Sequence, residues 1–167
     1  MLDQVFDAQA NAIRRHGGEI LKFIGDGLLA IFPVAAPDDA PVAAEHAMVA
    51  ASKALAAVRA IDHHPGREDP LKIVIALYYG TVIYGNISAA DRLDFSVIGP
   101  AVNLVSRIEA VAKSFDLPLI VSDDFARVHG GTLRCSECTA FAGLTDLTSC
   151  LRRWRLRRSS GADPSLA

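Results

Sequence analysis

The sequence has few of the features that mark secreted, membrane-spanning or nucleic-acid-binding proteins. It contains 3 cysteines in 167 residues, an odd number that does not form a disulfide framework. No uninterrupted apolar run approaches the roughly 18 to 20 residues of a membrane span, and the first residues lack the layout of a signal peptide. The formal net charge of -2 gives no reason to expect a nucleic acid or an anionic membrane as the main partner. These absences together predict a cytoplasmic location.

Two of the cysteines, Cys135 and Cys138, have the spacing of a zinc-binding pair. No second pair and no histidine ligand motif follows them in the sequence, so a zinc site is not expected. Apolar residues, in contrast, make up 51% of the chain and predict a well-buried core. A chain of 167 residues has room for one such domain and little room for two.

The most informative stretch is residues 17–32, GGEILKFIGDGLLAIF. Apolar runs at residues 20–24 and 28–32 flank Gly25-Asp26-Gly27, and an Asp-Gly tip between such runs predicts a β-hairpin with Asp26 at its tip. The flanking glycines let a charged ligand approach the main chain, which suits a carboxylate that holds a metal under a phosphate. The alternative is that Asp26 is only the residue that such a turn prefers.

Lys22 is a single cation within the otherwise apolar first run. Burial of an unpaired ammonium group is costly, so a lysine in a buried strand is expected to have a partner or a ligand. Alternatively, the side chain reaches the solvent at the edge of a sheet.

Hydrophobic periodicity and turn residues divide the rest of the chain into alternating helices and strands. We expect helices over residues 2–16, 38–63, 100–113 and 123–129, and strands over residues 71–79, 82–87, 95–98 and 118–122. Residues 88–94, SAADRLD, read as a polar loop. This order predicts an α/β domain with a mixed sheet flanked by helices.

The helix expected at residues 100–113 has two distinct faces. Apolar residues form one stripe, whereas Asn103 and Arg107 lie four residues apart on another face and point out of the core together. A polar outer face is the simplest interpretation. The position directly after a strand and a glycine turn also suits a phosphate or ribose site, because arginine matches phosphate oxygens with a rigid fork of donors.

Two motifs identify a family. HGGEILKFIGDGLLAIFP, followed by LDFSVIGPAVNLVSRIEA, resembles the catalytic domains of class III nucleotidyl cyclases, the adenylate and guanylate cyclases, over roughly residues 2–131. The diguanylate cyclases share the general fold, but their signature does not follow Gly17-Gly18-Glu19. The resemblance implies a ferredoxin-like α+β cyclase fold whose first strand and helix are missing, and it assigns residues 1–146 to a partial catalytic domain.

The resemblance also implies an activity and a site. The family converts ATP to cyclic AMP and pyrophosphate with two Mg²⁺ (or Mn²⁺) ions, in the manner of a two-metal clamp. Asp26 matches a metal aspartate, Arg107 the arginine that stabilises charge on the α-phosphate, and Asn103 the residue that orients the ribose. Lys22 and Ser96 match the positions that contact the base, and a lysine at the first of them is typical of an enzyme that uses ATP. Three further residues are expected to bind the substrate: Phe23, Ile24 and Gly25. The family places its site between two chains, which implies a homodimer, or a heterodimer with a complete cyclase subunit.

The sequence departs from the family pattern at both ends. The motif with the first metal aspartate is absent, and Asp3 and Asp7 do not match it. Ala142 occupies the position of a phosphate-binding lysine, and residues 147–167 read as a basic tail, disordered or produced by a shift of the reading frame. The chain is therefore expected to be an adenylate cyclase by ancestry. The alternative is an impaired fragment or pseudoenzyme that serves as a nucleotide-binding or dimerisation module.

Overall fold

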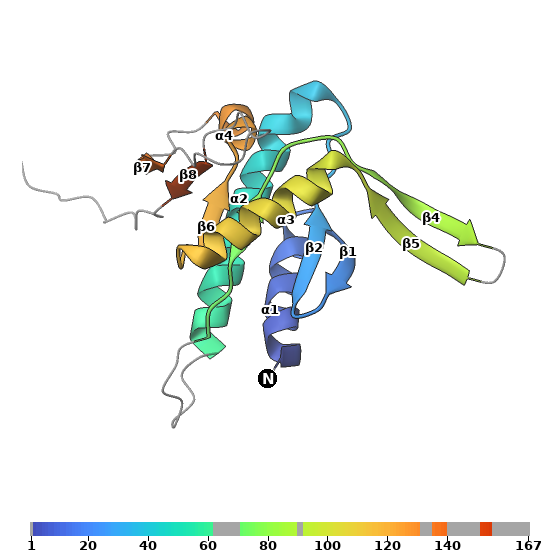
Figure 1. Cartoon of the computed structure of the whole chain (residues 1–167), viewed down its shortest axis with the longest axis horizontal. Coiled ribbons are helices and arrows are strands. Elements are labelled where there is room, and N and C mark those ends of the chain that lie inside the picture. The colour runs from blue at the N-terminus through green and yellow to red at the C-terminus, as the bar shows by residue number, and fades with distance from the viewer. Residues whose placement is uncertain (1, 62–70, 90–91, 131–134, 140–150, 155–167) are drawn as a thin grey trace, which may run out of the picture.

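The structure is a computed structural model that describes residues 2–61, 71–89, 92–130, 135–139 and 151–154 (Figure 1). Its helices are α1 (Leu2–Arg15), the 3-10 helix Pro37–Asp39, α2 (Ala40–Ile61), α3 (Pro100–Ser114) and α4 (Asp123–His129). Its strands are β1 (Glu19–Ile24), β2 (Gly27–Ile31), β3 (Ile75–Leu77), β4 (Ile83–Ala89), β5 (Arg92–Ile98), β6 (Leu119–Val121), β7 (Cys135–Thr139) and β8 (Leu151–Trp154). This order confirms the expected alternation of helices and strands.

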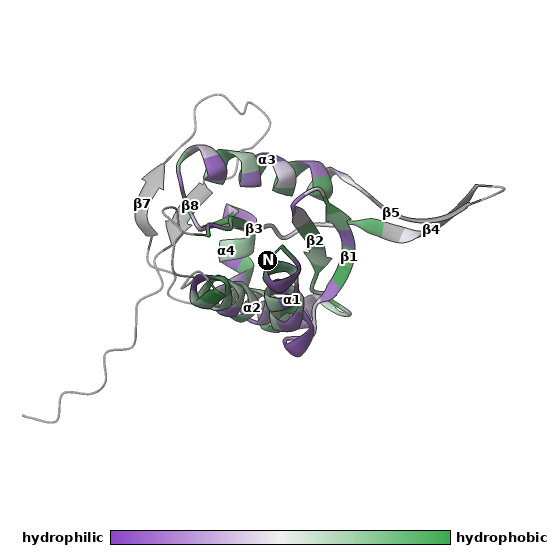
Figure 2. Cartoon of the chain, turned by 90° about the horizontal axis from the view of Figure 1, so that it is seen from below, coloured by the Kyte–Doolittle hydropathy of each residue, from purple (hydrophilic) through white to green (hydrophobic). Residues whose placement is uncertain are grey.

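The central strands lie between two layers of helices. Figure 2 shows α1 and α2 side by side on one side of β1, β2 and β3, with α3 on the opposite side. Successive side chains of a strand point to opposite faces of the sheet. Along β3 and β6, alternate side chains therefore pack with different helices. Ile75, Leu119 and Val121 pack with α2 and α4, whereas Ala76 and Ile120 pack with α3. The two faces of one short parallel pair thus hold both helical layers together.

Alanine is the main packing residue of α2. The buried residues of this helix are Ala40, Ala44, Ala47, Met48, Ala50, Ala51, Ala54, Leu55 and Val58. Small side chains let neighbouring elements approach closely, and α1 and α4 both pack against α2. Ala43 and Ile61, near the two ends of the helix, are half-buried. Among the described helices, none is long and apolar enough to cross a membrane.

The strands form three separate sheets. β1 pairs with β2, β4 pairs with β5, and the remaining strands form one sheet in the order β3-β6-β8-β7. In the last sheet β3 and β6 are parallel while β8 is antiparallel to β6 and β7, so this sheet is mixed, as expected. The strand predicted over residues 71–79 is confirmed only at residues 75–77, where β6 supplies three paired residues.

The polar loop predicted over residues 88–94 is wrong. β4 and β5 form a long antiparallel hairpin that includes Ser88, paired with Leu93, and Ala89, paired with Arg92. Backbone pairing does not require apolar side chains, so a hairpin that extends away from the core carries no alternating signal. Both views show this hairpin projecting from the body as an arm (Figures 1 and 2). We call it the β4–β5 arm.

β8 lies inside residues 147–167, the segment predicted to be a disordered or frame-shifted tail. The described residues of this segment pair with β6 through Arg152 and Arg153. The interpretation of residues 147–167 as a disordered or frame-shifted tail stays a prediction, and most of the segment lies outside the described residues.

Candidate active site

Asp26 lies at the tip of the hairpin between β1 and β2, as predicted. Ile24 pairs with Gly27, which leaves a two-residue loop of Gly25 and Asp26. Gly25 has a φ of 59°, in a region that residues with a Cβ atom rarely adopt, so glycine is the residue that this loop position favours. The exposed Asp26 is held outside the core by a rigid turn and remains accessible to a cation.

The tip of this hairpin also exposes apolar side chains. Phe23 and Ile24 are each 54% exposed, which is unusual for large apolar residues side by side on one strand. Phe23 packs edge to face against Phe6 of α1, with ring centroids 5.2 Å apart, so one contact ties the hairpin to the first helix. The surface around Asp26 is thus partly apolar and suited to cover by another molecule.

Lys22 is exposed and pairs through its backbone with Leu29. The interpretation that it is buried is wrong, because β1 is paired on one side only and presents Lys22 at the edge of its sheet. Within the described residues, the ammonium group makes no hydrogen bond or ion pair, so it is free to meet a ligand. The register of the hairpin shifts between Ile20 and Lys22, which changes the direction of the strand at this point.

Asn103 and Arg107 both lie exposed on α3, one turn apart, as predicted. The opposite side of this helix is anchored in the core by Ile108 and Ala112, each with 0% exposure. Gly99 precedes the first turn of α3 and has a φ of 155°. A Cβ atom added at this position would lie 3.3 Å from the Thr81 carbonyl oxygen, so the backbone approaches residue 81 closely at the start of the helix. The two polar side chains are therefore presented to the solvent by a well-anchored helix.

The last turn of α3 carries a charged pair. The pKa of Lys113 is raised by its hydrogen bond to Glu109 and by the charge of Glu109, against a weaker desolvation effect, and least of all by the charge of Asp26. Lys113 lies six residues beyond Arg107. At a rise of about 1.5 Å per residue, that spacing is about 9 Å along the helix axis.

Ser96 belongs to β5, where its backbone pairs with Gly85. Its side chain lies outside what the structure describes, so its predicted contact with adenine stays a prediction. The adjacency of β1 and β5 does bring the strand of Lys22 against the strand of Ser96.

The Asp26 carboxylate can serve as one ligand of a divalent cation, but other ligands are needed to complete the coordination. Among the described residues, no group of three or more histidine, cysteine or acidic side chains is arranged to hold a metal. Mg²⁺ in nucleotide enzymes is commonly bound by one or two carboxylates together with the phosphates of the substrate. The exposed Asp26 carboxylate fits this arrangement, in which the phosphates of the nucleotide complete the coordination of the metal ion.

The comparison with known proteins identifies the family. The family model for the adenylate and guanylate cyclase catalytic domain matches residues 1–147. The chain belongs to the class III nucleotidyl cyclases. Its structure is similar to the guanylyl cyclase Cya2, with a TM-score of 0.72, 27% sequence identity and coverage of 90% of this chain and 75% of Cya2. The fold also matches the adenylyl cyclase CyaB from P. aeruginosa, with a TM-score of 0.69 and 23% identity over 96% of this chain and 83% of CyaB.

Curated relatives include cyclases and uncharacterized proteins. An adenylate cyclase of Anabaena cylindrica is 30% identical over 139 residues, 81% of this chain and 26% of that protein. An uncharacterized protein of Mycobacterium tuberculosis is 35% identical over 135 residues, 80% of this chain and 24% of that protein. The cyclase domain thus spans about a quarter of the length of these relatives.

Sequence reasoning missed the minor effect of the Asp26 charge on the pKa of Lys113. No local pattern signals this effect, because the two residues are 87 positions apart in the sequence. It also missed the ion pair between Lys72 and Asp116, whose Nζ and Oδ2 atoms lie 2.9 Å apart.

Proposed function

We propose that this chain is the catalytic domain of an adenylate cyclase, which converts ATP to cyclic AMP and pyrophosphate. The observation that carries the proposal is the joint exposure of Asn103 and Arg107 on one side of α3, together with Asp26 at a rigid, exposed hairpin tip. These are the polar groups that family membership assigns to the ribose, the α-phosphate and the metal. None of the three is used to stabilise the described fold.

The chemistry requires charge stabilisation more than covalent participation by the protein. In the reaction the 3'-hydroxyl oxygen releases its proton to the solvent and bonds to the α-phosphorus, the bond to pyrophosphate breaks, and negative charge develops on the α-phosphate oxygens. Arg107 donates hydrogen bonds to those oxygens and Asn103 holds the ribose in position, so both act where the charge develops. Asp26, with the phosphates of ATP, would hold Mg²⁺ or Mn²⁺, which supplies further charge neutralisation when bound.

Lys22 and Ser96 favour ATP over GTP as the substrate of this proposal. Lys22 has a free ammonium group with three donors, and a serine hydroxyl can accept a hydrogen bond from the adenine amino group. Phe23, Ile24 and Gly25 follow Lys22 on the first hairpin and offer an apolar and backbone surface to the nucleotide. The similarity to both guanylyl and adenylyl cyclases leaves the base to be decided by these side chains.

The site is proposed to form between two chains. Asp26 lies close enough to Lys113 to affect its pKa, near the end of α3, whereas Asn103 and Arg107 occupy earlier turns. A second chain, placed head to tail, would bring its Asn103 and Arg107 to this chain's Asp26. The exposed Phe23 and Ile24 and the projecting β4–β5 arm provide surface for that contact (Figure 1).

The test is the formation of cyclic AMP from Mg-ATP and Mn-ATP by the purified full chain, alone and mixed with a complete class III cyclase subunit that is inactive by itself because its own counterpart of Arg107 is replaced by alanine. The proposal predicts cyclic AMP in at least one of these samples and its loss with Arg107→Ala. Cyclic AMP only in the mixture would make this chain the donor of one half-site. Its absence from both samples would contradict the proposal.

The second candidate function is a nucleotide-binding or dimerisation module without catalysis. The specific observation in its favour is that the described residues contain no group of three or more metal-binding side chains, whereas a two-metal reaction normally uses more than one carboxylate. Equilibrium binding of a non-hydrolysable ATP analogue, without turnover of ATP, would support this candidate over the first.

A further inference from the structure

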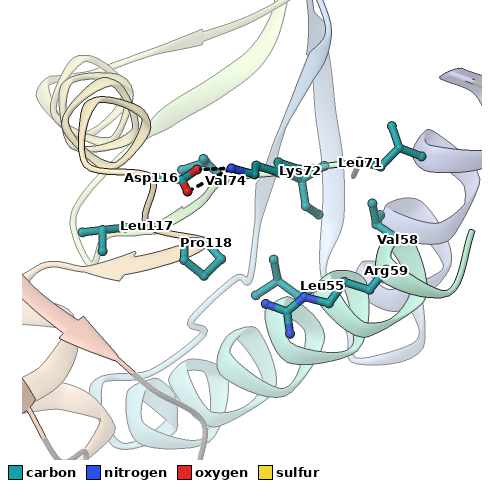
Figure 3. Close-up of a pocket in the computed structure, with 10 residues that line it drawn as sticks. Leu55, Val58, Arg59, Leu71, Lys72, Val74, Asp116, Leu117 and Pro118 are labelled. Atoms are coloured by element: carbon teal, nitrogen blue, oxygen red, sulfur yellow. Dashed lines mark hydrogen bonds and ion pairs between the residues drawn. The ribbon is translucent and has the colours of Figure 1, made fainter. Parts of the chain in front are cut away.

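A pocket of about 260 Å³ lies at the opposite end of α3 from Asn103 (Figure 3). It is bounded by the end of α2, the segment that leads into β3, and the turn between α3 and β6. Most of its lining is apolar: Leu55, Val58, Leu71, Ile73, Val74, Leu117 and Pro118. Leu55, Val58 and Leu117 are buried, so the base of the pocket is part of the core.

Two cations and one carboxylate complete the lining. The Lys72 Nζ atom donates to both Asp116 carboxylate oxygens, at 3.0 and 2.9 Å, and this pair is open to solvent with side chains 62% and 74% exposed. Arg59, in the last turn of α2, extends its guanidinium along the pocket (Figure 3). Within the part of the chain that the structure describes, Arg59 forms no ion pair or hydrogen bond. The described lining residues therefore carry a net charge of +1, with the unmatched charge on Arg59.

We propose that this pocket binds a small amphipathic carboxylate, a molecule with an apolar body of about eight carbon atoms and one acidic group. A cavity of about 150 Å³ lined by apolar side chains accommodates benzene, so the larger volume here suits a longer chain or a substituted ring. The apolar body packs on Leu55, Val58 and Leu117, and the carboxylate accepts hydrogen bonds from the Arg59 guanidinium. A medium-chain fatty acid and an aryl-alkyl carboxylate share this chemistry.

A ligand in this pocket would contact Leu117, a residue that is hydrogen-bonded to the last turn of α3. Leu117 follows that helix directly, and its backbone N–H donates to the Ala112 carbonyl oxygen at 2.9 Å, which closes the last turn. A ligand that packs on Leu117 stabilises this turn and raises the thermal stability of the chain, because it binds the folded state alone. The pocket does not include any residue assigned to the nucleotide, so the proposal does not depend on cyclase activity.

The test is calorimetric titration of the full chain with octanoate and with 3-phenylpropionate, which distinguishes the two sources of the carboxylate. The expected result is saturable, one-to-one binding of at least one probe, weakened about tenfold by Arg59→Gln. Arg14→Gln, which removes an equally exposed arginine from α1, is the matched control and leaves the affinity unchanged.

A second variant tests the charge argument by a gain of affinity. Asp116→Asn leaves Lys72 unpaired, and asparagine tolerates the positive φ of 51° at this position, so the fold is retained. Octanoate or 3-phenylpropionate is then expected to bind severalfold more tightly. Binding of octanol as tight as that of octanoate, no response to either substitution, or no saturable binding would overturn the proposal.

Discussion

Asn103 and Arg107 lie one turn apart on the exposed side of α3, and the buried Ile108 holds that helix on the strands behind them. Arg107→Ala is expected to lower kcat for cyclic AMP formation by about 100-fold or more, because its donors act on charge that develops in the transition state. Binding of an unreactive ATP analogue should change little. Steady-state kinetics and equilibrium binding, with Arg14→Ala as the control, separate the two effects; unchanged turnover would contradict the assignment.

Asp26→Asn is expected to remove the dependence of activity on Mg²⁺ and Mn²⁺ concentration together with most of the activity. The amide keeps the shape of the loop residue but loses the charge that holds a divalent cation. Asp38→Asn, on the exposed 3-10 helix, removes a comparable carboxylate and serves as the control. Metal titrations at fixed ATP measure the effect, and a normal metal response of the Asp26 variant would show that this carboxylate is not a ligand.

Lys22→Ala is expected to lower the preference for ATP over GTP by about tenfold, since it removes one hydrogen-bonding group from the base. The measurement is the ratio of kcat/KM for the two nucleotides, which cancels any general loss of activity. Lys53→Ala on α2 should leave the ratio unaltered. A ratio that is equally unaltered in the Lys22 variant would remove this residue from the base-binding surface.

Glu109 and Lys113 make a pH-dependent contribution to stability. Their Oε1 and Nζ atoms lie 2.7 Å apart, and the pKa of Lys113 is raised in the folded chain by the hydrogen bond and charge of Glu109. A raised lysine pKa stabilises the fold at pH values below the ordinary value near 10.5, and this stabilisation is lost as the pH rises through the folded-state pKa. An exposed pair of this kind contributes about 0.3–0.5 kcal/mol.

A double-mutant cycle with Glu109→Gln and Lys113→Met checks this sign. The coupling in the free energy of unfolding, measured by urea denaturation, should be present at pH 8 and decrease as the pH rises beyond the ordinary lysine pKa of 10.5. A coupling that persists at the higher pH would show that the pair does not act through the charge of Lys113.

The local elements that carry the site are predictable because their signals are contained in short stretches. The Asp-Gly tip fixes the first hairpin, and Pro100 with its apolar stripe fixes α3. α4 begins at a serine cap, a residue type typical of helix starts, since Ser122 Oγ accepts from the Phe125 N–H at 3.1 Å. Asp26, Asn103 and Arg107 therefore stand at the predicted positions of their elements.

Features set by distant partners are not predictable in this way. The apolar run at residues 71–79 is typical of one long strand. β3 has only three residues, because β6 forms backbone pairs with three residues of this run. The β4–β5 arm includes polar residues such as Ser88 and Arg92, whose backbone pairing does not depend on an apolar sequence pattern.

The measurement that tests the shared catalytic site most directly is complementation between two inactive variants. Asp26→Asn and Arg107→Ala chains are mixed, allowed to exchange subunits, and assayed for cyclic AMP formation. Random pairing makes half of the dimers mixed, each with one intact site, so the account predicts recovery of about a quarter of the activity of the unmodified chain. No recovery, while the unmodified chain converts ATP under the same conditions, would contradict a site built from two chains.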